Sequence, residues 1–301
     1  MSEIQGWINL YKPKNISSFK AINKIKKHFS FKKIGHAGTL DPLAEGILPV
    51  AIGKTTKLIP FIQSDLKCYK FTVYWGTQTS TDDTDGNVIR RSHIIPNLKD
   101  IKNNLNKFIG FNLQTPPKVS AVKINGQRAY ILARRNKDFK IPEKQVYVKK
   151  IQLLRHHGHT TTFYIECGKG FYIRSFARDI AMLLGTYGHV LSLERVKVGN
   201  FVKETSILLD DLLKISERHD LFNCILPSVS MLDDILAYEI NDRKDIVDLS
   251  FGKSIKIKED FAKALFSKKN DKKNIFLSSK GDIVSIGRLI GNLFIPYKIL
   301  I

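Results

Sequence analysis

Apolar residues recur at helical spacing near the start of the chain. Residues 18–29 carry Phe19, Ile22, Ile25 and Phe29 near one face of a predicted helix, while lysines occupy the rest of its surface. A serine at position 17 or 18 is a suitable N-cap. The lysines form either a solvated face or, because a glycine-rich segment follows, a surface that tracks a phosphate backbone.

Helical and strand patterns alternate further along. Helical spacing predicts helices over residues 97–109, 175–184, 208–213 and around 231–235. Aromatic and β-branched runs predict strands over 69–75 and 161–167, and polar residues predict a turn over 83–87. From residue 254 onward, short β-like runs are separated by turns. We therefore predict a mixed α/β catalytic domain over residues 1–230 and a small β-rich domain over residues 231–301.

The charge of the chain narrows the class of partner. The 301 residues (34.3 kDa) include 49 Lys+Arg and 28 Asp+Glu, a formal net charge of +21. Residues 1–230 hold 36 basic and 18 acidic side chains, whereas residues 231–301 hold 13 and 10. This excess indicates a polyanion, with nucleic acid as the first candidate, that contacts mainly residues 1–230. The alternative is a solvated basic surface.

Several classes of protein are excluded. Cys68, Cys167 and Cys224 are far apart, and no His/Cys spacing suits a metal, so we predict reduced thiols and no metal site. No apolar run is long enough to cross a membrane, and the N-terminus lacks the apolar stretch of a signal peptide. Residues 4–40 contain no acidic residue, but the first arginine is Arg90, which argues against a transit peptide. A cytoplasmic location is expected.

The segment Gly35-His36-Ala37-Gly38-Thr39-Leu40-Asp41-Pro42-Leu43-Ala44-Glu45-Gly46 is the densest chemical signal. Its glycines permit unusual backbone conformations and the close approach of another chain, and its proline stiffens the loop. Asp41 is therefore a candidate catalytic carboxylate presented on a stiff loop. In the alternative reading, it merely caps a helix at a turn.

Two further segments place aromatic side chains beside cations. Tyr69 stands between Lys67 and Lys70 at a strand start, where it either stacks on a base or belongs to the core. Tyr172 and Arg174 follow two glycines, and on an extended strand they would share one face. That pair suits an unstacked base or a carboxylate partner. A surface hairpin with an incidental arginine is the alternative.

These segments together resemble the bacterial TruB-type tRNA pseudouridine synthases, and the glycine-rich segment resembles that family's Gly-His-x-Gly-x-Leu-Asp-Pro-x-Ala motif. The resemblance covers about the first 205 residues, with its motifs in order. The motifs are Lys12-Pro13, Gly35–Gly46, Lys67–Lys70, Thr79–Gly86, Gln114–Lys123, Gly170–Ser175 and Leu193-Glu194-Arg195.

The resemblance implies a fold and an activity. The fold would be α+β: a pseudouridine-synthase catalytic domain with a mixed, mostly antiparallel sheet flanked by helices, plus a small C-terminal β-rich, PUA-like RNA-binding domain. The family isomerises the T-loop uridine (position 55) of tRNA to pseudouridine, with base flipping, a covalent aspartate intermediate and neither cofactor nor metal. The partner would be the T-arm of tRNA, and nothing in the sequence suggests more than a monomer.

The resemblance also assigns roles to six residues. Asp41 matches the nucleophile, Tyr69 the tyrosine that stacks on the base and is a candidate base for ribose deprotonation, and Arg174 the arginine that pairs with the aspartate. His36, Tyr172 and Leu193 match residues that line the nucleotide pocket.

The sequence departs from the family pattern at a few positions, and two other functions remain open. Glu45 stands where threonine is common, and Ser80 stands where aspartate is common. A glycosidase would need a second carboxylate, for which Glu45 is the candidate near in sequence. A non-catalytic RNA chaperone would use the same surface without needing Asp41.

Overall fold

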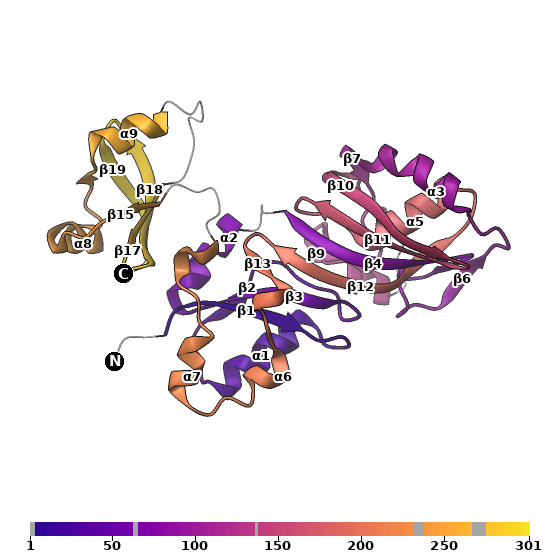
Figure 1. Cartoon of the computed structure of the whole chain (residues 1–301), viewed down its shortest axis with the longest axis horizontal. Helices are drawn as coiled ribbons and strands as arrows, with labels where there is room; N and C mark the ends of the chain where they lie inside the picture. Colours follow the sequence, from indigo (N-terminus) through magenta and orange to yellow (C-terminus); the bar gives the residue numbers. More distant parts are fainter. Residues whose placement is uncertain (1–3, 63–65, 136–137, 232–236, 267–274) are drawn as a thin grey trace.

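The structure is a computed structural model that describes residues 4–62, 66–135, 138–231, 237–266 and 275–301. A large part built on one long mixed sheet packs against a smaller C-terminal part (Figure 1). Within the described residues, none of the helices is both long and apolar enough to cross a membrane. The predicted α+β class, with a mixed, mostly antiparallel sheet and a β-rich C-terminal part, is confirmed.

The large sheet has the strand order β14-β1-β3-β12-β4-β11-β10-β7. The β1/β14 and β12/β3 pairs are parallel and the other pairs are antiparallel. In that order the strands span Ile207–Leu208, Gly6–Lys12, Glu45–Ile52, Gly188–Val198, Lys67–Trp75, Thr160–Cys167, Lys144–His157 and Gly110–Gln114. Two short strands and two two-stranded ribbons complete this part: β2 (Ile34–His36) on β3, β13 (Phe201–Val202) on β12, β5 (Thr77–Thr79) with β6 (Val88–Arg91), and β8 (Lys123–Ile124) with β9 (Gln127–Arg128).

Helices pack against this sheet and enclose an apolar core. The core is aromatic where α5 crosses the sheet, because the ring of Phe176 contacts Phe71 of β4 and Phe163 of β11 edge to face. The α-helices are α1 (Ser18–His28), α2 (Ile59–Ile62), α3 (Leu98–Leu105), α4 (Ala129–Arg134), α5 (Ile173–Leu183), α6 (Leu209–Leu212) and α7 (Arg218–Asn223). The 3-10 helices are η1 (Gly53–Leu58), η2 (Asn106–Phe108), η3 (Lys203–Thr205) and η4 (Ser228–Met231).

The first predicted helix is confirmed, with one error about its buried face. The hydroxyl of Ser17 accepts the backbone N–H of Lys20 and caps α1, as expected. Phe19, however, is 67% exposed, and Ala21 is buried with Ile22 and Ile25 instead. Residue 19 lies about 100° from residue 18 around the helix, so it turns away from the face set by residues 18, 21, 22 and 25.

The other predicted elements are also found. The predicted strands over 69–75 and 161–167 correspond to β4 and β11, and the predicted helices over 175–184 and 208–213 to α5 and α6. The helix predicted over 97–109 is the α-helix α3 followed by the 3-10 turn η2. Of the helix predicted around 231–235, Met231 ends η4, and residues 232–236 lie outside the described residues.

The C-terminal part is a five-stranded sheet of order β15-β17-β18-β19-β16. It also contains two eight-residue helices that the sequence analysis did not predict. The strands are β15 (Ala237–Glu239), β16 (Ile255–Lys256), β17 (Ile275–Ser279), β18 (Asp282–Ile290) and β19 (Leu293–Ile299), and the helices are α8 (Arg243–Ser250) and α9 (Glu259–Phe266).

The two parts share an apolar junction. Trp7 of β1 is fully buried there with Phe276, Ile286 and Leu300, and its indole N–H donates to the carbonyl of Ser228 at 3.1 Å. Because the C-terminal sheet completes a core begun by β1 and β3, it is held against the large part. The domain boundary at residues 230/231 stays a prediction.

Phe276 provides a test of this junction. Its ring is fully buried and meets the ring of Phe61 edge to face with a centroid separation of 5.4 Å. We expect Phe276→Ala to lower the free energy of unfolding by about 3–5 kcal/mol, because it leaves a cavity between the two parts. Urea unfolding measures the change, and a loss below about 1 kcal/mol would show that the junction is loosely packed.

Candidate active site

The loop that carries Asp41 connects β2 to β3. Where it enters β3, the backbones of β3 and β12 lie very close together. Gly46 has φ +110° and lies against β12, where a Cβ atom would stand 2.2 Å from the carbonyl oxygen of Arg195. Only glycine fits both the conformation and the contact. The parallel pairing of Glu45 and Gly46 with Glu194 and Arg195 thus brings the loop to the middle of the sheet.

Arg195 holds this loop from inside the protein. Its side chain is almost fully buried, and it donates from Nε to the carbonyl of Ile47 at 2.7 Å. Its terminal nitrogens donate to the carbonyls of Gly38 at 3.0 Å and Thr39 at 3.4 Å. These bonds fix the backbone just before Asp41. Sequence reasoning placed Arg195 in a motif but gave it no role, because its partners come from β3 and the loop, far away in sequence.

Two more polar side chains fix the loop from the side of α1. The ammonium group of Lys12 is enclosed and donates to the carbonyls of Ala44 at 2.6 Å and Ile16 at 2.7 Å. Burial lowers the pKa of Lys12 to about 8, while the carboxylate of Asp41 opposes this shift. The hydroxyl of Ser18 accepts from the N–H of Leu40 and donates to its carbonyl. The backbone on both sides of Asp41 is therefore tethered.

Asp41 is paired with Arg174, as predicted. Nε of Arg174 lies 2.9 Å from Oδ2 of Asp41, and the guanidinium is 5% exposed while the carboxylate is 33% exposed. The arginine thus aims one edge of an accessible carboxylate into the site.

A second carboxylate lies on the other side of the same guanidinium. Nη1 of Arg174 lies 3.4 Å from Oδ2 of Asp83 and donates to the carbonyls of Thr81 and Val119. Asp83 is buried, and burial raises the pKa of its carboxyl although Arg174 and the hydroxyl of Thr81 lower it. Sequence reasoning placed Asp83 in a turn and in the motif Thr79–Gly86 but gave it no role, since nothing local distinguishes it from the other acidic residues there.

The expectation that Tyr172 and Arg174 share one face of a strand is wrong. Arg174 lies in the first turn of α5, and Tyr172 is the residue that precedes this helix. The cause is a long-range contact: the side-chain amide of Gln114 receives the N–H of Tyr172 at 2.8 Å and donates to its carbonyl at 3.1 Å. Gln114 thereby fixes the backbone where the helix begins, and both side chains still reach the same pocket.

One pocket of about 320 Å³ brings together five of the six predicted site residues, Asp41, Tyr69, Tyr172, Arg174 and Leu193. Tyr69 of β4 and Arg195 of β12 are direct cross-strand partners, and Leu193 lies two residues before Arg195. An aromatic ring and an aliphatic side chain thus stand beside the carboxylate, an arrangement suited to a flat, uncharged ring. Lys67 and Arg195 add positive charge.

His36 is the predicted residue that does not line this pocket. It ends β2, and burial together with the nearby charge of Arg195 lowers the pKa of its imidazole. Its predicted contact with a nucleotide stays a prediction.

Two alternatives, a second carboxylate for hydrolysis and a metal site, find little support among the described residues. Glu45 points to Lys14, whose Nζ lies 3.2 Å from its carboxylate, and it does not line the pocket. Across the described ranges there is no cluster of three or more His, Cys, Asp or Glu side chains arranged to hold a metal ion. Cys167 is buried, which raises the pKa of its thiol to about 12.

Comparisons with known proteins match most of the chain to two family models. Residues 26–173 match the TruB family pseudouridylate synthase (N terminal domain), and residues 174–233 match the tRNA pseudouridylate synthase B C-terminal domain. The chain is 44% identical to tRNA pseudouridine synthase B of Ehrlichia ruminantium over 76% of this chain and 78% of that protein. It is 40% identical to tRNA pseudouridine synthase B of Caulobacter vibrioides over 84% of this chain and 81% of that protein.

The fold is similar to that of a solved structure over nearly the whole chain. A chain in the crystal structure of a Cbf5-Nop10-Gar1 complex superposes with a TM-score of 0.74 at 22% identity, covering 98% of this chain and 85% of that one.

Arg174 has a measurable role in folding. We expect Arg174→Ala to lower the free energy of unfolding by about 3–5 kcal/mol, because it leaves the buried carboxylate of Asp83 without its cation. Arg174→Lys keeps the positive charge but loses the planar guanidinium that reaches both carboxylates. We therefore expect it to lower the free energy of unfolding clearly less than Arg174→Ala does. Urea unfolding of both variants checks the order, and equal costs would contradict it.

The phenol of Tyr69 should stay protonated at neutral pH. Burial raises its pKa to about 12, with Arg195 opposing the shift. Because the folded-state pKa lies above the ordinary value near 10, Tyr69 stabilises the fold below pH 10, and this contribution is lost as the pH rises from 10 to 12. The ultraviolet tyrosinate titration of the native protein minus that of Tyr69→Phe measures this group, and a midpoint near 10 would contradict the expectation.

Proposed function

We propose, because this chain belongs to the TruB family of pseudouridylate synthases and isomerises uridine in tRNA, that its target is the T-loop uridine at position 55. The observation that carries the proposal is the ion pair of Asp41 and Arg174 inside a pocket walled by Tyr69 and Leu193. The reaction would proceed through a covalent bond to Asp41 and would use neither cofactor nor metal.

The chemistry requires a nucleophile and an enclosure. The C–N bond from the ribose to N1 of uracil breaks and a C–C bond from the same ribose carbon to C5 forms. The proton on C5 leaves and N1 takes up a proton, so the nucleotide keeps its composition. Asp41 attacks the sugar or the base and divides this exchange into two easier steps. Arg174 keeps the attacking oxygen in position, and the pocket retains the detached uracil while it rotates.

The target base must leave its stack in the folded loop to reach Asp41. Stacking on Tyr69 offsets part of that cost, since a base on an aromatic ring gains roughly 1–3 kcal/mol. Because the phenol stays protonated at neutral pH, Tyr69 accepts a ribose proton only if its own proton moves on in the same step. Its cross-strand partner Arg195 lines the same pocket.

The surrounding residues support isomerisation over hydrolysis. A glycosidase of the usual kind places two carboxylates about 5–9 Å apart on opposite sides of the scissile bond. Glu45 is held by Lys14 outside the pocket, and Asp83 is buried behind Arg174. Neither is placed to activate a water molecule. A pure RNA chaperone would have no use for the carboxylate of Asp41.

A group of lysines at the junction of the two parts supports RNA binding. Lys33, Lys54, Lys57 and Lys298 are close enough that burial and their mutual repulsion lower the pKa of Lys57. Lys57 donates to the carbonyl of Ile299 at 2.7 Å, and Lys298 donates to the carbonyl of Lys57 at 3.1 Å. None of the four has a carboxylate partner among the ion pairs of the described residues. Such a cluster suits backbone phosphates.

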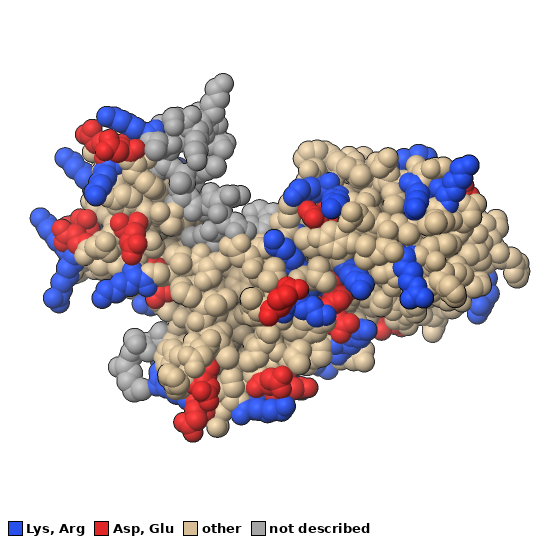
Figure 2. All heavy atoms as spheres, viewed as in Figure 1, with Lys and Arg blue, Asp and Glu red and all other residues tan. Residues whose placement is uncertain are grey.

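The surface beyond these lysines is also mostly positively charged. Lys and Arg dominate the charged groups around β4, β10 and β11, whereas acidic and basic groups lie side by side in the C-terminal part (Figure 2). We infer that the T-arm binds across the catalytic part. The monomeric state and the cytoplasmic location stay predictions.

Release of tritium from C5 tests the reaction. We expect the native protein, in the presence of a chelator, to release tritium stoichiometrically from T-arm RNA labelled at C5 of its uridines. Asp41→Asn should release none, because the amide is no nucleophile, and should still bind the RNA. Release of free uracil would indicate a glycosidase, and activity that returns only with added metal would overturn the metal-free mechanism.

Salt dependence tests the phosphate contacts. We expect the affinity for tRNA to fall steeply between about 50 and 200 mM salt, since each neutralised phosphate releases counterions. Lys57→Ala should reduce the slope of log K against log salt by about 0.7–0.9. Lys214→Ala is the matched control, because Lys214 is exposed and paired with Asp211. An affinity that does not change with salt would contradict the proposal.

A further inference from the structure

One basic and aromatic segment is not used by the reaction. Lys26-Lys27-His28-Phe29-Ser30-Phe31-Lys32-Lys33 places pairs of lysines on both sides of three aromatic rings. It ends α1 and turns at Ser30, which has φ +55°. Cationic side chains interleaved with aromatic ones are typical of surfaces that bind single-stranded nucleic acid.

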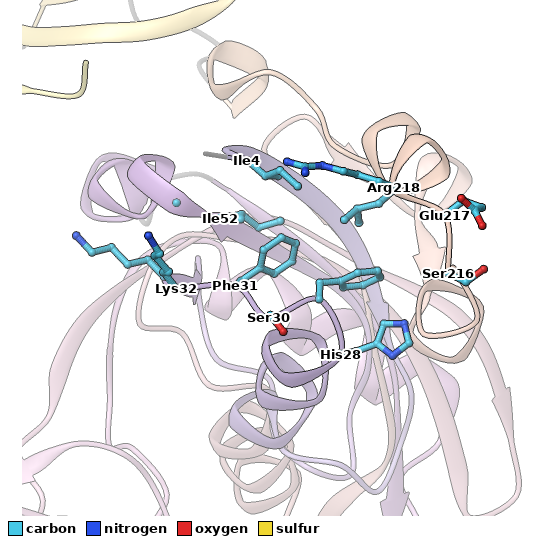
Figure 3. Close-up of a pocket in the computed structure, with 13 residues that line it drawn as sticks. Ile4, His28, Ser30, Phe31, Lys32, Ile52, Ser216, Glu217 and Arg218 are labelled. Atoms are coloured by element: carbon cyan, nitrogen blue, oxygen red, sulfur yellow. The ribbon is translucent and has the colours of Figure 1, made fainter. Parts of the chain in front are cut away.

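This segment forms one wall of a cavity of about 520 Å³. The opposite wall is the start of α7, and the floor comes from the end of β3 and from Ile4. Figure 3 shows the ring of Phe31 beside Ile52, with Arg218 extending over the cavity from α7, Lys32 on one side and His28 on the other. The cavity is therefore flanked by cations and has an apolar interior.

The three rings contact one another in a row, with His28 edge to face against Phe29 and Phe31 tilted by 34° from Phe29. The ring centroids of His28 and Phe29 lie 4.5 Å apart and those of Phe29 and Phe31 lie 5.5 Å apart. Phe31 is buried, whereas Phe29 is half-buried and keeps ring surface accessible. His28 is fixed by a contact of Nε2 with the carbonyl of Ile215 at 3.0 Å, which ties the end of α1 to the segment before α7. A flat ring entering the cavity would meet aromatic and aliphatic surface.

The charge at the rim is positive. Lys32, Lys33 and Arg218 are exposed, and none of them appears in the ion pairs of the described part of the chain. Glu217 is the one carboxylate among the lining residues and lies at the edge near Ser216 (Figure 3). An occupant that combines a flat ring with a negative charge therefore matches both the interior and the rim.

The cavity is separate from the reaction pocket. Glu45, which follows the Asp41 loop, begins β3, and Ile52, which lines the cavity, ends it. Seven residue steps along a strand span about 23 Å. One nucleotide cannot occupy both places, but two nucleotides of one folded RNA can.

We propose that the cavity binds an unpaired nucleotide, with its base against Phe29 and its phosphate between Arg218 and Lys32. The inference rests on the proposed function, because the RNA held at Asp41 is the source we favour for this nucleotide. A free nucleotide has the same chemistry, and the experiment separates the two sources.

The test compares full-length tRNA with the isolated T-arm hairpin, using Arg218→Glu and Phe29→Leu. We expect both variants to bind full-length tRNA roughly tenfold more weakly, through a lost phosphate contact and a lost stacking surface respectively. Binding and tritium release with the hairpin should stay as in the native protein. Lys107→Glu is the matched control, because it makes the same charge change at an exposed residue of η2.

A second arm titrates uridine monophosphate against protein labelled at its isoleucine methyl groups. Saturable shifts of Ile4 and Ile52 that vanish in Arg218→Glu would show that the cavity also takes a free nucleotide. An absence of shifts, with the tenfold loss for tRNA intact, would assign it to RNA alone.

Three results would separate failure of this inference from failure of the proposed function. The inference is overturned if both variants bind full-length tRNA like Lys107→Glu. It is also overturned if the hairpin loses affinity as much as the tRNA, because the effect would then reach the reaction pocket. A native protein that does not turn over the hairpin would instead refute the proposed T-loop activity.

Discussion

Arg195 is a cation enclosed in the interior, and the loop that carries Asp41 is built around it. Its partners are backbone carbonyls of the loop and of β3. A buried guanidinium is tolerated only where such acceptors surround it, so the cation and the loop conformation require each other. The contact of Gly46 with the backbone of Arg195 completes this arrangement. The ammonium group of Lys12 holds the loop in the same way from the other side. Asp41 is therefore left with few conformations except the one in which it contacts Arg174.

The sequence predicts well what depends on neighbours in the chain. The helix capped by Ser17 and the strand that carries Tyr69 follow from local spacing and composition. The grouping of five predicted residues in one pocket came from the family resemblance, because their spacing alone left Asp41 as a nucleophile or a cap. The T-loop target and the role of each residue remain proposals.

What could not be predicted depends on distant partners. Gln114 decides that Tyr172 precedes a helix and does not lie on a strand, yet the two are separated by 58 residues. Asp83 becomes part of the site only because α5 brings Arg174 to it. Helical spacing groups Phe19 with Ile22 and Ile25 near one face of the predicted helix, whereas the turn of the helix exposes Phe19. For Tyr172 and Asp83, tertiary contacts outweigh a local pattern.

The junction between the two parts has a consequence for synthesis on the ribosome. Trp7 leaves the ribosome 269 residues before Phe276, which completes its surroundings. At 5–20 residues per second, the N-terminal strand waits roughly 15–50 s for that cover. During most of this time the nascent chain exposes a tryptophan on a strand whose partner β3 has been made, while its other partner β14 has not. Chaperones that bind apolar segments can act on the nascent chain during this interval.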